Sequence, residues 1–315
     1  MKGKIIITIS LLIFSSMPGY SQFDYGFDFT KAGTAGLQFL KIGVGAKESA
    51  MGEAALGDTR GANAIFWNPA GIAAVSGKEV TFSQVGWLLG VDISAMAIAL
   101  NIKNYLVFGI SAIYLGLPEF EETTVLAQDG TGRMVSASDF AIGLAVAKNF
   151  TDKLAMGGQI RYVREQLDQD AFDNVLVDIG ARYFTGYRHL NLSVCAQHFG
   201  PDIRMLRDRF RMPLIFKIGM ADDLFYTESH KLMLAIDLLH PTDNIERVNC
   251  GLEYGLFQKA FIRAGYRINS DIGDWSFGVG LRQKLIGVDG AIDYGYSDYG
   301  EILGGVNRIT MSLQF

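Results

Sequence analysis

The sequence from Val80 to Phe315 is dominated by one pattern, segments of about ten residues in which apolar and polar side chains alternate before a turn. In the last segment one face carries Ile309, Met311, Leu313 and Phe315, and the other carries Arg308, Thr310, Ser312 and Gln314. Successive side chains of a β-strand point to opposite faces, so each segment predicts a strand with one apolar and one polar face. A strand that crosses an outer membrane is tilted and needs about 9–11 residues. The pattern therefore predicts an all-β membrane protein, an antiparallel transmembrane β-barrel of about 14 strands.

Composition argues against two other classes of protein. The net charge of −5 disfavours a nucleic-acid partner, because phosphates require a basic surface. Beyond the N-terminus no stretch holds about 18 uninterrupted apolar residues, so helical membrane spans are not expected. A soluble β-sandwich also alternates, but it does not need so many strands of membrane-crossing length.

The N-terminus has the features of a secretory signal peptide. An apolar run over residues 5–14 follows two lysines and precedes the small residues Gly19 and Ser21. This order predicts a signal peptide over residues 1–21 that is cleaved after Ser21. The alternative, a membrane anchor, is disfavoured because the apolar run is too short. The exported chain is then an N-terminal segment, residues 22–78, followed by the barrel, residues 79–315.

Loop lengths and charges provide two further checks on the barrel. Connections after even-numbered strands are short and those after odd-numbered strands tend to be longer, as expected for periplasmic turns and outer loops. The long outer loops include Gly116–Ala137 and Glu165–Asp173, whereas Asp222–His230 is an unusually long inner connection. A charge facing lipid at mid-membrane costs roughly 2–4 kcal/mol, so mid-strand charges should face the lumen. The following share that parity: Arg161, Asp178, Arg182, Lys217, Asp237, Glu253, Arg263, Arg282, Asp289, Asp293 and Arg308.

Small side chains are unusually frequent on the predicted lumenal face. They include Ala95, Ala97, Ala99, Ala141, Gly143, Ala145, Ala147, Ser276, Gly278 and Gly280. An empty lumen would forfeit packing contacts, so we expect a filler. The Ala- and Gly-rich segment Gly33–Ala74 precedes the first strand and is predicted to form a short helical plug. The alternative is a periplasmic subdomain outside the lumen.

Three local signals define the expected plug. Residues 47–56 predict a short helix, and Asp58 is expected to cap a second helix that runs toward Trp67. Asn68 and Pro69 predict a fresh helix start, with Asn68 at the N-cap and Pro69 at N1, where the missing N–H is not needed.

The two cysteines are predicted to remain unpaired. Cys195 and Cys250 lie three strands apart and on opposite faces of the expected sheet. Neighbouring strands are about 4.8 Å apart, so the gap of about 14 Å exceeds the reach of a disulfide.

The stretch from Phe39 to Ala54, followed by Asp58 and by Ala64 to Ile72, resembles the PorV/PorQ family. That family is similar to the FadL-type fatty-acid transporters, whose N-terminal hatch also carries an Asn-Pro-Ala motif. The resemblance marks a plug motif consisting of Asp58, Trp67, Asn68, Pro69, Ala70 and Gly71. The terminal Phe315 looks like the C-terminal signal for barrel insertion into the outer membrane.

This resemblance implies a plugged outer-membrane barrel and a non-enzymatic role in type IX protein secretion, as a cargo shuttle, docking protein or translocon partner. The alternative function is that of a FadL-like transporter of hydrophobic small molecules. The expected partners are outer-membrane lipid, with type IX components or cargo in the first case and a hydrophobic ligand in the second.

Other chemistry finds little support in the sequence. The four histidines lack metal-ligand spacing, and no nucleophile stands beside a base, so no cofactor, metal or enzymatic activity is expected. Four arginines between the seventh and eighth strands are candidates to bind lipopolysaccharide phosphates or an acidic protein, because guanidinium groups bind such anions bidentately. They are Arg204, Arg207, Arg209 and Arg211. An outer loop without a binding role is the alternative.

Overall fold

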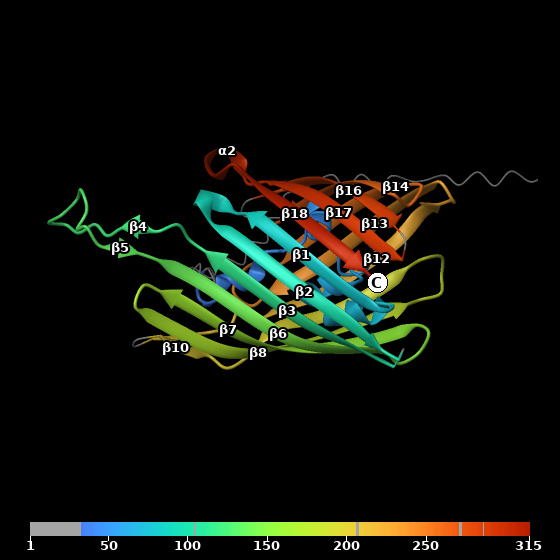
Figure 1. The fold of residues 1–315 in the computed structure, drawn as a ribbon, viewed down its shortest axis with the longest axis horizontal. Helices are drawn as coiled ribbons and strands as arrows, with labels where there is room; N and C mark the ends of the chain where they lie inside the picture. The colour runs from blue at the N-terminus through green and yellow to red at the C-terminus, as the bar shows by residue number, and fades with distance from the viewer. Residues whose placement is uncertain (1–32, 104, 206–207, 271–272, 286) are drawn as a thin grey trace, which may run out of the picture. The chain divides into compact units, whose positions relative to one another are not determined.

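The computed structural model describes residues 33–315 except 104, 206–207, 271–272 and 286. In this part of the chain, fourteen strands close into one antiparallel barrel (Figure 1). They are β1 (Lys78–Gly86), β2 (Asp92–Ile102), β3 (Leu106–Gly116), β6 (Ala137–Asn149), β7 (Leu154–Leu167), β8 (Asp170–Phe184), β9 (Asn191–Phe199), β12 (Ile215–Tyr226), β13 (His230–Pro241), β14 (Arg247–Leu256), β15 (Ala260–Ile268), β16 (Trp275–Leu285), β17 (Val288–Asp298) and β18 (Gly305–Gln314). The predicted barrel is confirmed. The predicted signal peptide, residues 1–21, lies outside the described residues and stays a prediction.

The barrel closes by pairing its first strand with its last. β1 and β18 are antiparallel, with Glu79 opposite Gln314 and Gly86 opposite Asn307. The seam ends in two backbone hydrogen bonds between Lys78 and Phe315, of 3.1 and 2.8 Å. Closure removes both sheet edges, which a membrane requires because hydrocarbon offers no partner for free backbone groups. The terminal Phe315 thus completes the seam, and its role as an insertion signal stays a prediction.

Side-chain alternation in the strands follows the predicted parity. On β18, Arg308 and Thr310 are 1% and 3% exposed, whereas Ile309 and Met311 are 46% and 51% exposed on the outer face. Other strand charges buried in the lumen are Arg161, Asp178, Asp237, Glu253 and Arg263. The cysteines also lie as predicted, three strands apart, with Cys195 buried toward the lumen and Cys250 on the other face.

The two ends of the barrel differ in their connections. At one end, here called the turn end, each connection is a short turn. The other end, the loop end, carries a helix and two small hairpins. These are α2 (Gly300–Leu303), β4 (Phe120–Glu121) with β5 (Met134–Val135), and β10 (Ile203–Met205) with β11 (Asp208–Phe210). The short η4 (Leu88–Gly90) connects β1 and β2 at the loop end.

Two connections differ from the sequence prediction. The predicted loop Glu165–Asp173 is wrong, because β7 and β8 pair as far as Leu167 and Asp170 and leave only a tight turn. The predicted long inner connection Asp222–His230 is also wrong. β12 continues to Tyr226 through an irregularity in register, which restores pairing after the alternation breaks.

The part of the N-terminal segment that the structure describes folds inside the barrel as a plug with four short elements. They are η1 (Gln38–Lys41), α1 (Ala46–Ala50), η2 (Ala62–Phe66) and η3 (Pro69–Ala74). α1 contacts β15 to β18, while η3 contacts β6 to β8 on a different part of the wall, so the alternative of a separate periplasmic subdomain is excluded. Among the described residues, none of the helices has the length and apolarity to cross a bilayer.

Two of the three local predictions for the plug are corrected. The helix predicted over residues 47–56 ends at Ala50, because Gly52 and Glu53 adopt left-handed conformations with φ of 65°. Asp58 does not cap a helix: η2 begins after Gly61 without a side-chain cap. The third prediction is confirmed, since Asn68 Oδ1 accepts a hydrogen bond of 3.0 Å from the Ala70 N–H and Pro69 occupies N1.

Wall glycines allow the plug backbone to approach closely. A Cβ atom on Gly157 would lie 2.6 Å from the Pro69 carbonyl carbon, and one on Gly265 would overlap the backbone of Met51 and Gly52. A larger side chain at either position would push the plug off the wall. The small residues on the lumenal wall are therefore explained by the close packing of the plug backbone against it.

Candidate functional site

Two of the spaces that border the plug among the described residues lie toward opposite ends of the barrel. The turn-end cavity has a volume of about 710 Å³ and is lined by plug residues, including Lys47 and Asp58, and by strand ends and turns. The loop-end pocket is much smaller, about 30 Å³. The candidate functional site is this plugged lumen, so the contacts that hold the plug decide what the lumen can do.

Polar wall side chains hold the plug through its backbone. Asp237 accepts hydrogen bonds of 2.9 Å from the N–H groups of both Ala55 and Leu56. The Arg308 guanidinium donates to the Gly43 carbonyl at 3.0 Å. Two further anchors are Thr310, which accepts from the Ala46 N–H, and Gln197, which donates to the Phe66 carbonyl. Short 3-10 turns leave many backbone groups unpaired, so a polar lumenal wall is what satisfies them.

The plug also carries an internal network around Glu48. This carboxylate is 3% exposed and accepts a 2.8 Å hydrogen bond from Asn63 Nδ2. Burial raises the pKa of Glu48 above its ordinary value. Burial disfavours the charged carboxylate here, and Lys47 and Asn63 offset the effect only in part.

Residues of the predicted plug motif make contacts within the plug and between the plug and the barrel wall. Trp67 is buried and its Nε1–H donates to the Val44 carbonyl at 2.9 Å. Asn68 caps η3 and also donates to the Ala181 carbonyl on β8 at 3.3 Å. Ala70 and Gly71 are buried, and a Cβ on Gly71 would lie 2.5 Å from the Thr59 carbonyl oxygen. These contacts hold the motif residues within the plug and against the wall.

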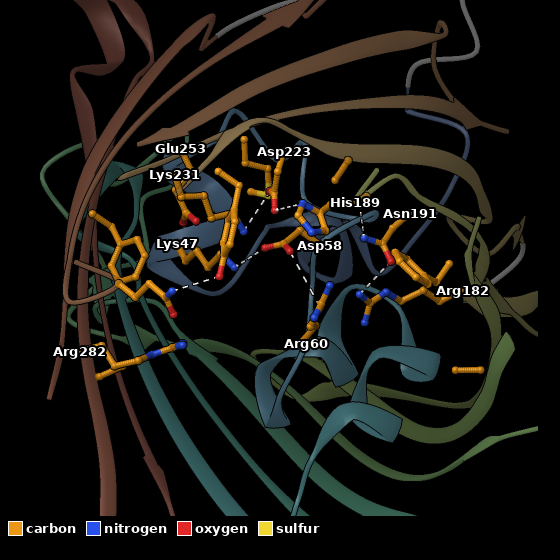
Figure 2. A pocket seen from close by; sticks show the side chains of 18 of the residues that line it. Lys47, Asp58, Arg60, Arg182, His189, Asn191, Asp223, Lys231, Glu253 and Arg282 are labelled. Atoms are coloured by element: carbon orange, nitrogen blue, oxygen red, sulfur yellow. Dashed lines mark hydrogen bonds and ion pairs between the residues drawn. The ribbon is translucent and has the colours of Figure 1, made fainter. Parts of the chain in front are cut away.

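Asp58 is the motif residue that faces the turn-end cavity. Figure 2 shows its carboxylate between Lys47 and Arg60, with the Lys47 Nζ at 2.7 Å and the Arg60 Nε at 4.0 Å. Burial alone would raise the pKa of Asp58, but Lys47, followed by Lys231 and Arg60, holds it below its ordinary value. Burial likewise opposes the charge on Lys47, yet Asp58 raises the pKa of that amine above its ordinary value. The pair is therefore ionised in the plug.

Six further residues around this cavity form two paired clusters on the wall. Arg263 binds Glu253 at 2.7 Å and Asp293 at 2.6 Å. Asp223 receives Lys231 at 3.1 Å and His189 at 3.2 Å (Figure 2). The sequence predicted that strand charges face the lumen, but the pairs depend on strand register.

The loop-end pocket has a mixed lining of apolar and of polar or charged side chains. The apolar ones are Leu40, Ile42, Val44, Phe66, Trp67, Ile113, Ile215 and Leu239. The polar or charged ones are Lys41, Glu53, Arg161, Gln197, His198, Lys217 and Arg247. The Lys217 Nζ lies 5.5 Å from the centroid of the Trp67 ring. The pocket is therefore amphipathic, with apolar and charged groups on both the plug and the wall.

One wall feature beside this pocket escaped the sequence analysis. Arg161 binds Asp178 at 2.6 Å, and Asp178 also accepts a 2.7 Å hydrogen bond from the His198 N–H. His198 has a φ of 67°, next to an irregularity in the β8–β9 register. Alternation places Arg161 and Asp178 in the lumen, but no local signal marks the bulge at His198.

The predicted arginine cluster lies at the loop end, on the β10–β11 hairpin and just after it. Arg204 and Arg209 are exposed and directly opposite each other in the hairpin, and Arg211 is exposed one step beyond. Arg207 lies outside the described residues. The structure thus brings two of the four arginines together, and none of the three described ones lines either lumenal space.

Comparison with solved structures finds similar barrels. The Ralstonia pickettii toluene transporter TbuX matches with a TM-score of 0.60 and 11% identity over 86% of this chain and 97% of that one. The P. putida toluene transporter TodX matches with a TM-score of 0.56, 12% identity and coverage of 86% and 96%. A Pseudomonas aeruginosa FadL homologue matches with a TM-score of 0.54, 12% identity and coverage of 86% and 98%.

The chain has the fold of these FadL-type barrels. It is a multi-pass β-barrel of the bacterial outer membrane, so its turn end faces the periplasm and its loop end faces outward. No family model and no curated protein matches the sequence, so the resemblance to the PorV/PorQ family stays a prediction.

Proposed function

We propose that this protein is a transporter that carries hydrophobic small molecules across the outer membrane. The observation that carries the proposal is the barrel fold, which matches proteins described as toluene transporters over 86% of this chain. The apolar side chains that line part of the loop-end pocket, such as Leu40, Phe66 and Trp67, support it because they would contact an apolar ligand.

In the described conformation the loop-end pocket is too small for such a ligand. A volume of about 30 Å³ holds only a few water molecules. Entry of a hydrocarbon therefore requires the covering segment Leu40–Val44, or the Trp67 side chain, to shift. In this proposal a ligand passes through the barrel when the plug moves. The strand wall stays fixed, because its hydrogen-bond ladder is closed.

Uptake by whole cells tests the proposal. A host lacking its own hydrocarbon transporter is compared with and without this protein, using radiolabelled toluene, a labelled long-chain compound and a labelled sugar. We expect faster uptake of one or both hydrophobic probes and no change for the sugar. Equal uptake of all probes with and without the protein contradicts the proposal.

Docking of type IX cargo or of a translocon component is a second candidate function. It rests on the resemblance of residues 39–72 and on the exposed arginine pair Arg204 and Arg209, which faces outward on the β10–β11 hairpin. Deletion of the gene followed by assay of secreted and surface-attached type IX cargo tests it. Unchanged secretion contradicts this candidate and leaves transport standing.

A further inference from the structure

The turn-end cavity is polar and positively charged, in contrast to the chain as a whole. Among the described residues its lining includes seven Lys or Arg and five Asp or Glu, whereas the whole chain has a net charge of −5. A hydrocarbon gains nothing from such a surface. The cavity volume of about 710 Å³ is within the range of small-molecule sites, about 300–1,000 Å³.

Most of these charges are neutralised by neighbours. Arg263 is bound by two carboxylates, Lys231 by Asp223, and Lys47 by Asp58. These pairs explain why the cavity tolerates many ionised groups. The groups left without a close carboxylate are the ones available to a ligand.

Arg182, on the wall strand β8, lacks a carboxylate partner in the described part of the chain. Its Nη2 donates a hydrogen bond of 3.3 Å to Asn191 Oδ1. Its Nε is buried and has no hydrogen-bond partner among the residues that the structure describes. A buried guanidinium N–H without an acceptor is costly, and an anion in the cavity would satisfy it.

Arg60, on the plug, is only weakly paired. Its nearest carboxylate oxygen is Asp58 Oδ1 at 4.0 Å, while the other oxygen of Asp58 is 2.7 Å from Lys47. Figure 2 shows the guanidinium groups of Arg60 and Arg182 directed into the same cavity, one from the plug and one from the wall.

We propose that Arg60 and Arg182 form a binding site for a small soluble oxyanion, a di- or tricarboxylate or a phosphate ester, that enters from the periplasm. Guanidinium groups bind carboxylates and phosphates through paired charge-assisted hydrogen bonds. The cavity lies inside the barrel and opens at the turn end, so a soluble anion reaches it without leaving water. A ligand held by both arginines bridges plug and wall, and this goes beyond hydrocarbon transport and does not depend on it.

Calorimetric titration of the purified protein tests this site. The protein is kept at low ionic strength in a maltoside detergent, and citrate and glycerol 3-phosphate are titrated separately. We expect saturable binding of at least one probe. Arg182→Gln and Arg60→Gln should each weaken it about tenfold, because each removes a charge-assisted hydrogen bond. Arg182→Lys keeps the charge but loses the bidentate guanidinium, so it should weaken anion binding less than Arg182→Gln does.

Lys259→Gln is the matched control. Lys259 is an exposed cation in a turn at the same end of the barrel, and it does not line the cavity. Its loss should leave the affinity unchanged. Heat-modifiable migration in gel electrophoresis verifies that each variant remains a folded barrel. Absence of saturable binding by either probe overturns the proposal, as does an equal loss in the Lys259→Gln and Arg182→Gln variants.

Discussion

At the scale of single residues, the lumenal wall acts as a hydrogen-bond partner for an irregular plug. Asp237 is the plainest case, since one carboxylate oxygen accepts from two consecutive plug N–H groups. Arg308 does the reverse and donates to a plug carbonyl. The alternation that places charged side chains in the lumen, away from lipid, thus also supplies the groups that anchor the plug.

Replacing Asp237 should loosen the plug and leave the barrel closed. Asp237→Ala removes the acceptor of the Ala55 and Leu56 N–H groups, at about 1–3 kcal/mol for each buried group left unpaired. We expect faster hydrogen exchange at residues 55–56 by mass spectrometry and little change in β3 or β6. Asp237→Asn, which retains one acceptor oxygen, should show a smaller effect. Unaltered exchange in Asp237→Ala would show that this carboxylate does not hold the plug.

The Asp58–Lys47 pair predicts a dependence of stability on pH. The pKa of Asp58 is lower in the folded protein than its ordinary value of 3.8, through Lys47 and despite burial. A carboxyl of this kind stabilises the fold fully above its unfolded pKa and loses that contribution as the pH falls through its lower folded pKa. Asp58→Asn should therefore lower the free energy of unfolding by about 1.5–3 kcal/mol at pH 7 and by clearly less at pH 2.

Denaturant unfolding followed by tryptophan fluorescence at pH 7 and pH 2 measures this difference, since Trp67 reports on the plug. Asp152→Asn, at an exposed turn residue on the same cavity, is the control and should change little at either pH. An equal deficit of Asp58→Asn at both pH values would contradict the assignment.

At the scale of elements, the strands were predictable from the sequence and the plug was predictable only in part. Alternation defines a strand within a few residues, and closure requires no further signal. The turn end of β12 was missed because Asp222 and Asp223 interrupt the pattern, although the strand continues through a register shift. The Asn68-Pro69 start was found because a cap is a local signal, whereas the partner of Asp58 was not.

The candidate site was less predictable than the fold. The turn-end cavity combines Asp58 of the plug with Arg182 of β8 and Asp293 of β17, residues that only the closed barrel brings together. Local sequence patterns carry no information on such long-range pairs. The arginine cluster, by contrast, was visible in the sequence because its members are neighbours along the chain.

The close contact between the wall and the residues that follow α1 gives an element-scale prediction. Gly265→Val places a side chain into the backbone of Met51 and Gly52, so it should displace this part of the plug and lower thermal stability. Gly290→Val is the matched control, because a Cβ there meets its nearest neighbours at 3.7 Å, an ordinary contact. Calorimetric melting of both variants tests this. Equal melting temperatures would show that the plug does not require the glycine.

At the scale of the whole molecule, the protein is a closed strand barrel that holds a separately anchored plug in its lumen. The strand ladder is continuous around the barrel, while the plug is held to the wall by separate hydrogen bonds. Its segment Leu40–Val44 lines the loop-end pocket. Hydrophobic transport in this account requires the covering segment to move relative to the loop end. A reversible tether between the two is therefore the decisive test.

Gly36, four residues before the covering segment, and Phe210 of the β10–β11 hairpin offer the position for that tether. A Cβ on Gly36 lies 3.7 Å from the Phe210 Cβ, within the span of a disulfide, about 3.5–4.5 Å. The Gly36→Cys/Phe210→Cys variant, with Cys195 and Cys250 changed to Ala, is assayed for uptake of labelled toluene and a labelled long-chain compound before and after reduction. We expect uptake at background level when the disulfide is formed and recovery of uptake on reduction. Equally rapid uptake in both states would contradict it.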